Sequence, residues 1–298
     1  MELFGIPTQA LLGQFVLGLV NGAFYAILSL GLAVIFGMLN VVNFAHGAFF
    51  MMGAYLAWLG LDNLGVGYWW ALLLVPLLMA ILGACVERGL LQWLFELDHL
   101  YGLLLTFGLA IVIEGVFRDQ FGVSGQPYSG PAELQGATDL GFMRLPNYRA
   151  YVVVVSLFVC FLTWLCIERT KIGSLLRAAT ENAALVQAFG INVPVLVTVT
   201  FAFGAALAAF AGVLAAPIIQ ISPLMGSNII IVVFAVVVIG GMGSILGSIV
   251  TGVSLGVIEG LTKVLYPEAS STVVFVIMAV VLMVKPNGLF GNGVAVAR

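Results

Sequence analysis

Three polar side chains that could line a passage or bind one another lie between two strongly apolar runs near the start of the chain. Asn40, Asn43 and His46 follow one another at three-residue spacing. Such groups are costly beside hydrocarbon unless they face protein, water or each other. One interpretation is that the Asn and His side chains satisfy one another in a helix contact. The other is that Asn40, Asn43 and His46, with Gly47 loosening the helix, line or shape a translocation path.

Side chains for covalent or metal chemistry are scarce. The chain holds two histidines, His46 and His99, and three cysteines, with no CxxC pair and no His/Cys cluster. It also lacks GxxxxGK[ST] and HExxH, which are the signatures of a phosphate-binding loop and a zinc protease. The residues therefore indicate a protein that is not an enzyme, that has no metal site and that binds no cofactor itself.

The composition is that of a membrane protein. Of 298 residues, 62% are hydrophobic and 8% are charged, and the mean hydropathy is +1.20. A soluble domain carries roughly 25% charged residues, so a soluble enzyme is excluded. Ten basic and thirteen acidic residues give a formal charge of −3, which leaves no basic surface for nucleic acid. The sequence predicts an all-α polytopic protein of the lipid bilayer.

Nine apolar runs are candidates for membrane-spanning helices. They cover approximately residues 10–36, 44–60, 69–86, 101–117, 150–167, 194–216, 228–242, 245–265 and 272–284. The polar cluster at the start of the second run indicates a broken or re-entrant helix there, because irregular backbone at membrane depth must be buried or line a cavity. We expect about eight or nine transmembrane helices in a single domain over residues 1–298.

Three polar stretches separate these runs, at 87–99, 118–149 and 168–192. The first is a short mixed-charge connector. The second is rich in glycine and proline, which disfavour a long helix or a regular strand and predict an irregular exposed loop. Basic residues are in modest excess on one side if 87–99, 168–192 and the C-terminus share it. Nine spans would then place the N-terminus on the other side.

The third stretch predicts one amphipathic helix. Apolar side chains recur there at three- and four-residue spacing from Ile172 to Val186, with polar side chains opposite. Gly190 marks a stop, and Pro194 opens the next span. Such a helix could simply cover its neighbours, or it could dock a soluble partner. Its period alone does not choose between the two.

A glycine cluster predicts a sharp corner between two helices. Gly240, Gly241, Gly243 and Ser244 interrupt the apolar sequence, and small residues then recur at four-residue spacing up to Gly256. Small residues on one face let two membrane helices approach closely. We therefore expect the corner to be followed by a tightly packed helix.

Two carboxylates near the ends of apolar runs each precede a basic residue by four positions. The pairs are Glu114 with Arg118 and Glu259 with Lys263. A Glu four residues before a basic side chain is the favourable order on a helix. Both are predicted to form local ion pairs.

Nearly the whole chain resembles one family, the permease subunits of ABC importers for branched-chain amino acids. The resemblance rests on five motifs in the family's order: GLVNGAFYAILSLGLAVIFGMLNVVNFAHGAFFMMGAY, TKIGSLLRAATENAALVQAFGINV, TFAFGAALAAFAGVLAAP, VVVIGGMGSILGSIVTGVSLGVIEG and KPNGLFG. The NFAHG core and the GGMGS corner carry it most strongly. The wider group includes ribose and urea permeases.

The resemblance implies partners and a mechanism that composition alone does not. Such permeases sit in the bacterial inner membrane and pair to form the pore, here with a second, related permease. Two cytoplasmic ATPase subunits, which bind ATP and Mg, drive alternating access, and a periplasmic binding protein delivers the substrate. In this resemblance 118–149 is a periplasmic loop and 168–192 is the cytoplasmic coupling segment.

The resemblance also implies roles for individual residues. Arg177, Ala178, Glu181 and Gly190 match the pattern of the coupling segment, although the ThrGluAsn at 180–182 departs from it. Asn40, Asn43, His46 and Gly47 remain the candidates for the translocation path.

Two alternatives to branched-chain amino acid import remain open on the sequence. A permease of the same family could carry urea, short amides or another small solute, because substrate selection rests largely with a separate binding protein. An ion-coupled secondary transporter would need coupling residues within the spans, where carboxylates are few. Dependence of uptake on ATP or on an ion gradient separates these classes.

Overall fold

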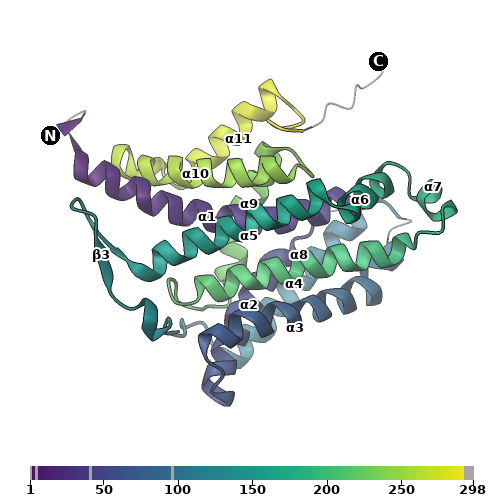
Figure 1. Cartoon of the computed structure of the whole chain (residues 1–298), viewed down its shortest axis with the longest axis horizontal. Coiled ribbons are helices and arrows are strands. Elements are labelled where there is room, and N and C mark those ends of the chain that lie inside the picture. The colour runs from purple at the N-terminus through teal and green to yellow at the C-terminus, as the bar shows by residue number, and fades with distance from the viewer. Residues whose placement is uncertain (1, 4–5, 40–41, 95–96, 292–298) are drawn as a thin grey trace.

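The computed structural model describes residues 2–3, 6–39, 42–94 and 97–291. Within them each of the nine apolar runs forms a helix, and the helices lie side by side in one bundle (Figure 1). These nine helices are α1 (Thr8–Leu39), α2 (Ala45–Leu64), α3 (Tyr68–Gly89), α4 (His99–Phe121), α5 (Asn147–Arg169), α8 (Val193–Ala215), α9 (Met225–Gly240), α10 (Ile245–Leu265) and α11 (Val273–Val284). Two short helices, α6 (Lys171–Glu181) and α7 (Ala183–Ala188), connect α5 to α8.

Six segments of the described chain are long and apolar enough to cross a membrane. They are α1, α4, α5, α8, α10 and the stretch Tyr68–Leu94, in which α3 continues into the 3-10 turn η1 (Leu91–Leu94). Helices α9 and α11 are apolar but shorter, at 16 and 12 residues. The prediction of an all-α polytopic membrane protein is confirmed.

The bundle has two distinct ends. The start of α1 and the long connection between α4 and α5 lie at one end, and α6 and α7 lie at the other (Figure 1). We call these the loop end and the α6–α7 end. The connector after α3 and the C-terminal residues up to Gly291 also line clefts at the α6–α7 end. The three segments that the sequence grouped on one side therefore do lie together.

Local capping explains where several helices begin. The Asp98 carboxylate accepts from the Leu100 amide at the start of α4, and the Asn192 side chain accepts from the Val195 amide at the start of α8. The Ser244 hydroxyl accepts from the Gly247 amide in the same way at α10. Side chains of this kind satisfy donors that the first helical turn leaves free.

The loop between α4 and α5 is shorter than the expected 118–149. Helix α4 continues to Phe121 and α5 begins at Asn147, because their apolar faces still pack on the bundle at these positions. The expectation of a wholly irregular loop was wrong in part, since β3 (Ala137–Asp139) pairs antiparallel with β4 (Arg144–Pro146). A 3-10 turn, η2 (Ala132–Leu134), precedes this hairpin, a second hairpin joins β1 (Glu2–Leu3) to β2 (Ile6–Pro7), and η3 (Pro267–Ala269) links α10 to α11.

Helices α1 and α10 pack closely along a seam of small residues. A Cβ atom on Gly256 would lie 2.2 Å from the Gly22 nitrogen, and one on Gly252 would lie 2.7 Å from the Ala26 Cα. Without side chains at these positions the two backbones touch directly, as in other small-residue contacts between membrane helices. The small-residue packing face predicted from the sequence is confirmed for Gly252 and Gly256.

Both predicted ion pairs are confirmed. Arg118 Nη2 lies 2.8 Å from Glu114 Oε1, and Lys263 Nζ lies 2.7 Å from Glu259 Oε1. Glu259 also accepts a hydrogen bond from the Tyr25 hydroxyl of α1 at 2.7 Å. That contact adds a polar link to the α1–α10 seam.

We predict that Gly256→Ala lowers the stability of the solubilised protein. The added methyl group must push α1 and α10 apart, and overpacking of this kind costs about 1–3 kcal/mol. The matched control is Gly108→Ala on α4, where a Cβ would meet nothing within 4 Å. The control should be neutral or slightly stabilising because alanine favours the helix. Thermal unfolding followed by size-exclusion chromatography compares the two, and equal midpoints would contradict the close seam.

Candidate functional site: a broken helix and the cleft at the α6–α7 end

The chain breaks between α1 and α2 and is held there by α4. Helix α1 ends at Leu39, and α2 begins at Ala45. The Thr106 hydroxyl of α4 accepts from the Phe44 amide at 3.2 Å, and its one proton reaches both the Val42 carbonyl at 3.2 Å and the Leu103 carbonyl of its own helix at 3.1 Å. A neighbouring side chain thus satisfies backbone groups that a break inside an apolar bundle would leave free.

His46, in the first turn of α2, is fully buried. Its Nε2 lies 3.0 Å from the Leu28 carbonyl of α1. Because a carbonyl only accepts, we assign the ring proton to Nε2, which leaves Nδ1 as an acceptor without a partner among the described residues. Gly31 makes room for the ring, since a Cβ there would lie 2.8 Å from the imidazole Cε1.

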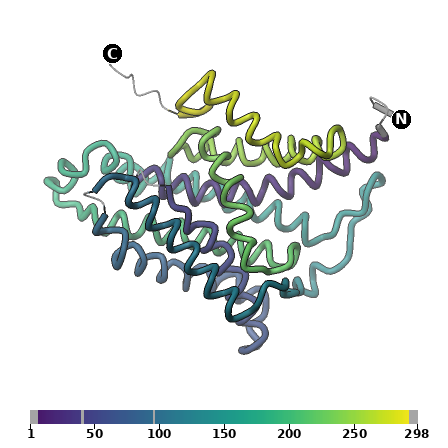
Figure 2. Tube along the Cα trace, turned by 180° about the vertical axis from the view of Figure 1, so that it is seen from behind, coloured from purple at the N-terminus to yellow at the C-terminus, as the bar shows by residue number. Residues whose placement is uncertain are grey.

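Gly47 lies where α2 crosses α9. A Cβ on Gly47 would lie 2.5 Å from the Gly226 carbonyl oxygen, so the two helices touch through their backbones near their first turns. Figure 2 shows α9 running across the direction of α1 and α10. His46 and Gly47 are therefore both packed between helices in this structure.

Asn43 is the unsatisfied member of the predicted cluster. Its side chain is 1% exposed, and neither Oδ1 nor Nδ2 has a hydrogen-bond partner in the part of the chain that the structure describes. Asn43 and His46 thus do not satisfy one another, as one interpretation of the sequence required. Asn40 lies outside the described residues. A role of these residues in a translocation path stays a prediction.

The predicted amphipathic helix over 168–192 is in fact two helices. Residues up to Arg169 belong to α5, and the remainder divides at Asn182 into α6 and α7. The Asn182 side chain accepts from the Leu185 amide and so starts a new helix in place of continuing the old one. Gly190, at φ +83°, follows α7 as the predicted stop.

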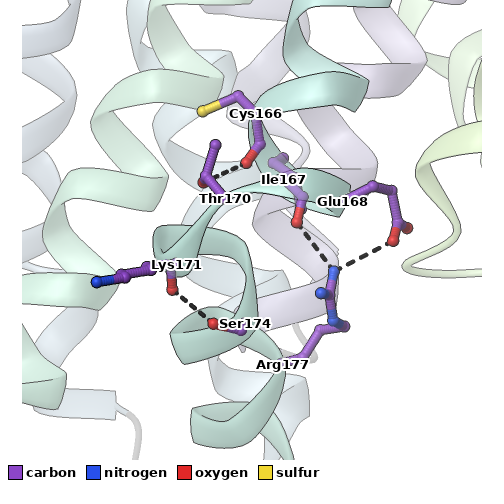
Figure 3. A network of polar contacts seen from close by, with 7 residues as sticks. All are labelled: Cys166, Ile167, Glu168, Thr170, Lys171, Ser174 and Arg177. Carbon is purple, nitrogen blue, oxygen red and sulfur yellow. Dashed lines mark hydrogen bonds and ion pairs between the residues drawn. The ribbon is translucent and has the colours of Figure 1, made fainter.

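Arg177 connects α6 to the end of α5. Its Nη1 donates to the Ile167 carbonyl at 2.9 Å and lies 3.3 Å from Glu168 Oε2 (Figure 3). The turn between the two helices also depends on Gly173, because a Cβ there would overlap the Ile167 carbonyl oxygen. Sequence reasoning did not single out Gly173. The available signal in the sequence was its position, three residues after Thr170, where the apolar run of α5 has ended.

The other predicted coupling residues are exposed. Ala178 and Glu181 face solvent on α6, and Glu181 is its last residue. Apolar side chains are exposed alongside them, including Leu185 at 54% and Phe189 at 77%. The α6–α7 segment therefore presents a mixed polar and apolar surface outside the bundle.

The glycine corner joins α9 to α10 and meets the C-terminal segment. Gly241 and Gly243 have φ values of +102° and +83°, which favour glycine, and Ser244 caps α10. The amides of Leu289 and Phe290 donate to carbonyls of the last α9 residues, Ile239 and Gly240. The GGMGS and KPNGLFG motifs are thus in direct contact.

Two clefts open at the α6–α7 end. One, of about 460 Å³, lies between α1, α6, the glycine corner and the C-terminal segment. The other, of about 470 Å³, lies between the ends of α1 and α3, the start of α4, the α6–α7 segment and the start of α8. The α6–α7 segment forms a wall of both, so its position bears on both openings.

Glu87 is a residue of this second cleft that sequence reasoning missed. It was expected in a polar connector over 87–99, but α3 continues to Gly89 and the Glu87 side chain is buried. The Thr198 hydroxyl of α8 donates to Glu87 Oε2 at 2.6 Å. The signal in the sequence was a lone carboxylate directly after an apolar run, with α8 supplying the hydroxyl 111 positions later.

Comparison with known proteins identifies the family. The family model described as branched-chain amino acid transport system / permease component matches residues 14–283. The chain belongs to this permease family. The match includes the broken helix, the α6–α7 segment and the glycine corner, and it ends at residue 283, before the KPNGLFG motif that contacts this corner.

Relatives of known name match this permease along most of their length. It is 28% identical to the high-affinity branched-chain amino acid transport system permease protein LivH of Escherichia coli K12, over 94% of this chain and 96% of that one. It is 29% identical to permease protein BraD of Pseudomonas aeruginosa, with the same coverage. LivM of Escherichia coli K12 matches at 26%, over 89% of this chain and 67% of its own. No solved structure matches.

We predict that Thr106→Val destabilises the permease and that Thr251→Val does not. Valine keeps the shape of threonine, but at position 106 it leaves backbone groups of the break unpaired, at a cost of about 1–3 kcal/mol. Thr251 is also buried, and its hydroxyl has no partner among the described residues. Thr106→Ser should retain most of the stability. Unfolding in SDS measures all three, and equal losses at positions 106 and 251 would contradict the role of the hydroxyl bond.

Proposed function

We propose that this permease is one of the two membrane subunits of an ATP-driven ABC importer and carries branched-chain amino acids across a bacterial inner membrane. Family membership supports the transport role, and the α6–α7 segment, which stands outside the bundle at one end, carries the proposal of a driving partner. In this proposal the α6–α7 end is cytoplasmic and the loop end is periplasmic.

The connections of the α6–α7 segment suit transmission of force into the bundle. Arg177 ties α6 to α5, and α7 leads directly into α8 through the Asn192 cap. Helix α8 in turn touches α2 closely, since a Cβ on Gly53 would lie 2.4 Å from the Ala209 carbonyl oxygen. Movement of α6 and α7 would therefore reach the helix that carries His46.

The partners follow from this mechanism. Two cytoplasmic ATPase subunits would bind ATP and Mg and close on each other, moving the α6–α7 segment and switching the pore between its outward-open and inward-open forms. A periplasmic binding protein would deliver the substrate to the loop end. The pore partner is proposed to be a second, related permease, because two differently named permease proteins of one transport system, LivH and LivM, both resemble this chain.

The proposal assigns the path to the region of the helix break. Asn43, His46 and Gly47 lie at the start of α2, where α1, α2 and α9 meet. Asn43 has unused hydrogen-bonding groups there. Rearrangement of these contacts on opening would expose a few polar groups in an apolar lining, which suits an aliphatic amino acid.

We predict that the tagged permease, purified in mild detergent from its native membrane, brings with it two P-loop ATPases and a second permease. Reconstituted with the binding protein in liposomes, the complex should take up labelled leucine only when ATP is supplied. Uptake driven by an ion gradient without ATP would refute the proposal in favour of a secondary transporter. ATP-driven uptake of urea or a short amide in place of leucine would correct the substrate and keep the mechanism.

We predict that Phe189→Asp weakens retention of the ATPase subunits in the same purification. Phe189 is 77% exposed on the α6–α7 segment, and a charge there would be desolvated against a partner surface. The matched control is Val123→Asp at the loop end, where the native side chain is 71% exposed. Quantitative mass spectrometry of the co-purified subunits compares the variants. Equal retention in both would argue against docking at Phe189.

A further inference from the structure

Glu87 is an ionisable residue at a place where few charges are tolerated. It lies in the wall of the 470 Å³ cleft at the α6–α7 end, and its side chain is 1% exposed. Ionisable side chains buried in membrane proteins are costly and usually serve a function. The carboxylate therefore needs a hydrogen-bonding or ionic partner.

The described residues satisfy the Glu87 carboxylate only in part. Glu87 Oε2 accepts from the Thr198 hydroxyl at 2.6 Å, and Arg88 Nε reaches the same hydroxyl at 3.4 Å. No described Lys or Arg side chain forms an ion pair with Glu87, and no described donor bonds its Oε1. Arg88 acts on this carboxyl electrostatically but forms no ion pair with it. A cation from outside the protein would supply the direct ion pair that the described residues do not.

The remainder of the cleft limits what this cation can be. Most of the lining is aliphatic, from the ends of α1 and α3 and the start of α8, and its polar side chains are Gln92, His99 and Gln187. A volume of about 470 Å³ is within the range of small-molecule sites. An apolar chamber with one carboxylate and a few hydrogen-bonding groups is complementary to a small aliphatic molecule that bears an ammonium group.

We propose that this cleft binds an aliphatic amino acid, with Glu87 accepting hydrogen bonds from the ammonium group and the apolar wall receiving the side chain. The proposal rests on the proposed function, and it adds to it a binding site within this one chain at the end where the substrate leaves. Gln92, His99 and Gln187, the other polar side chains of the lining, are the candidates to bind the carboxylate of the amino acid.

The proposed site includes residues of the α6–α7 segment, on which the ATPase subunits are proposed to act. Ala179 and Ala183 of the α6–α7 segment line the same cleft as Glu87. A ligand that fits one position of this segment better than another shifts the balance between the two.

The test uses the complete complex in lipid nanodiscs, with neither binding protein nor nucleotide present, and measures equilibrium binding of tritiated leucine. 3-Methylbutylamine, which keeps the ammonium group and the aliphatic chain, should compete. 4-Methylpentanoate, which lacks the ammonium group, should compete at least tenfold more weakly. This series uses the unaltered complex and does not depend on any variant folding.

Variants then locate the site. Glu87→Gln should weaken leucine binding about tenfold or more, and Glu87→Asp should weaken it less because it retains the charge. The matched control is Glu114→Gln on α4, which removes a carboxylate that already forms an ion pair with Arg118 of the same helix. The control should bind leucine as the unaltered complex does.

The outcomes separate this inference from the proposed function. Suppose that the unaltered complex takes up leucine when ATP is supplied. The proposed site would then be overturned, and the importer function kept, by any one of three results: undetectable leucine binding, equal competition by both analogues, or unchanged leucine binding by an assembled Glu87→Gln complex. Absence of ATP-driven uptake with all partners present would overturn the proposed function itself.

Discussion

Backbone amides and carbonyls inside an apolar bundle have no water to bond, and this constraint governs the centre of the molecule. The chain leaves α1 at Leu39 and starts α2 among other helices, where broken helical bonds would otherwise be lost. Thr106 of α4 supplies replacements on both sides of residue 43. The break is therefore a held conformation, and the Asn43 side chain beside it keeps its own hydrogen-bonding groups unused.

Small residues allow the neighbouring helices to act on this break. Glycines bring α10 against α1, α9 against α2 and α8 against α2 until backbones touch. A large side chain between two helices can change rotamer and absorb a small displacement, whereas a backbone contact transmits it. In the proposed transport cycle, displacement of α8 would pass to α2, and displacement of α9 would reach α2 at Gly47.

The α6–α7 end gathers features that are far apart in the sequence. The α6–α7 segment borders both clefts, the glycine corner is bonded to the C-terminal segment, and Arg177 ties α6 to α5. Arg177 Nη1 bonds within the chain and helps to orient the segment, while exposed side chains of α7 can meet a partner. A driving subunit and a bound amino acid would act on the same short piece of chain.

The sequence by itself determined the class of protein, the nine helices, the two ion pairs four residues apart, the small-residue face of α10 and the grouping of three polar segments at one end. The grouping followed from the distribution of basic residues, and the others depend on hydropathy and on spacing within one helix, which are local. Only the tertiary structure decided that Thr106 holds the break, that His46 bonds the Leu28 carbonyl and that Glu87 is buried under Thr198. The partners in these contacts are 18 to 111 positions apart, and hydropathy does not say which face of a uniformly apolar helix meets which neighbour. The division of the expected amphipathic helix at Asn182 was also missed, because a single capping side chain outweighed a continuous apolar period.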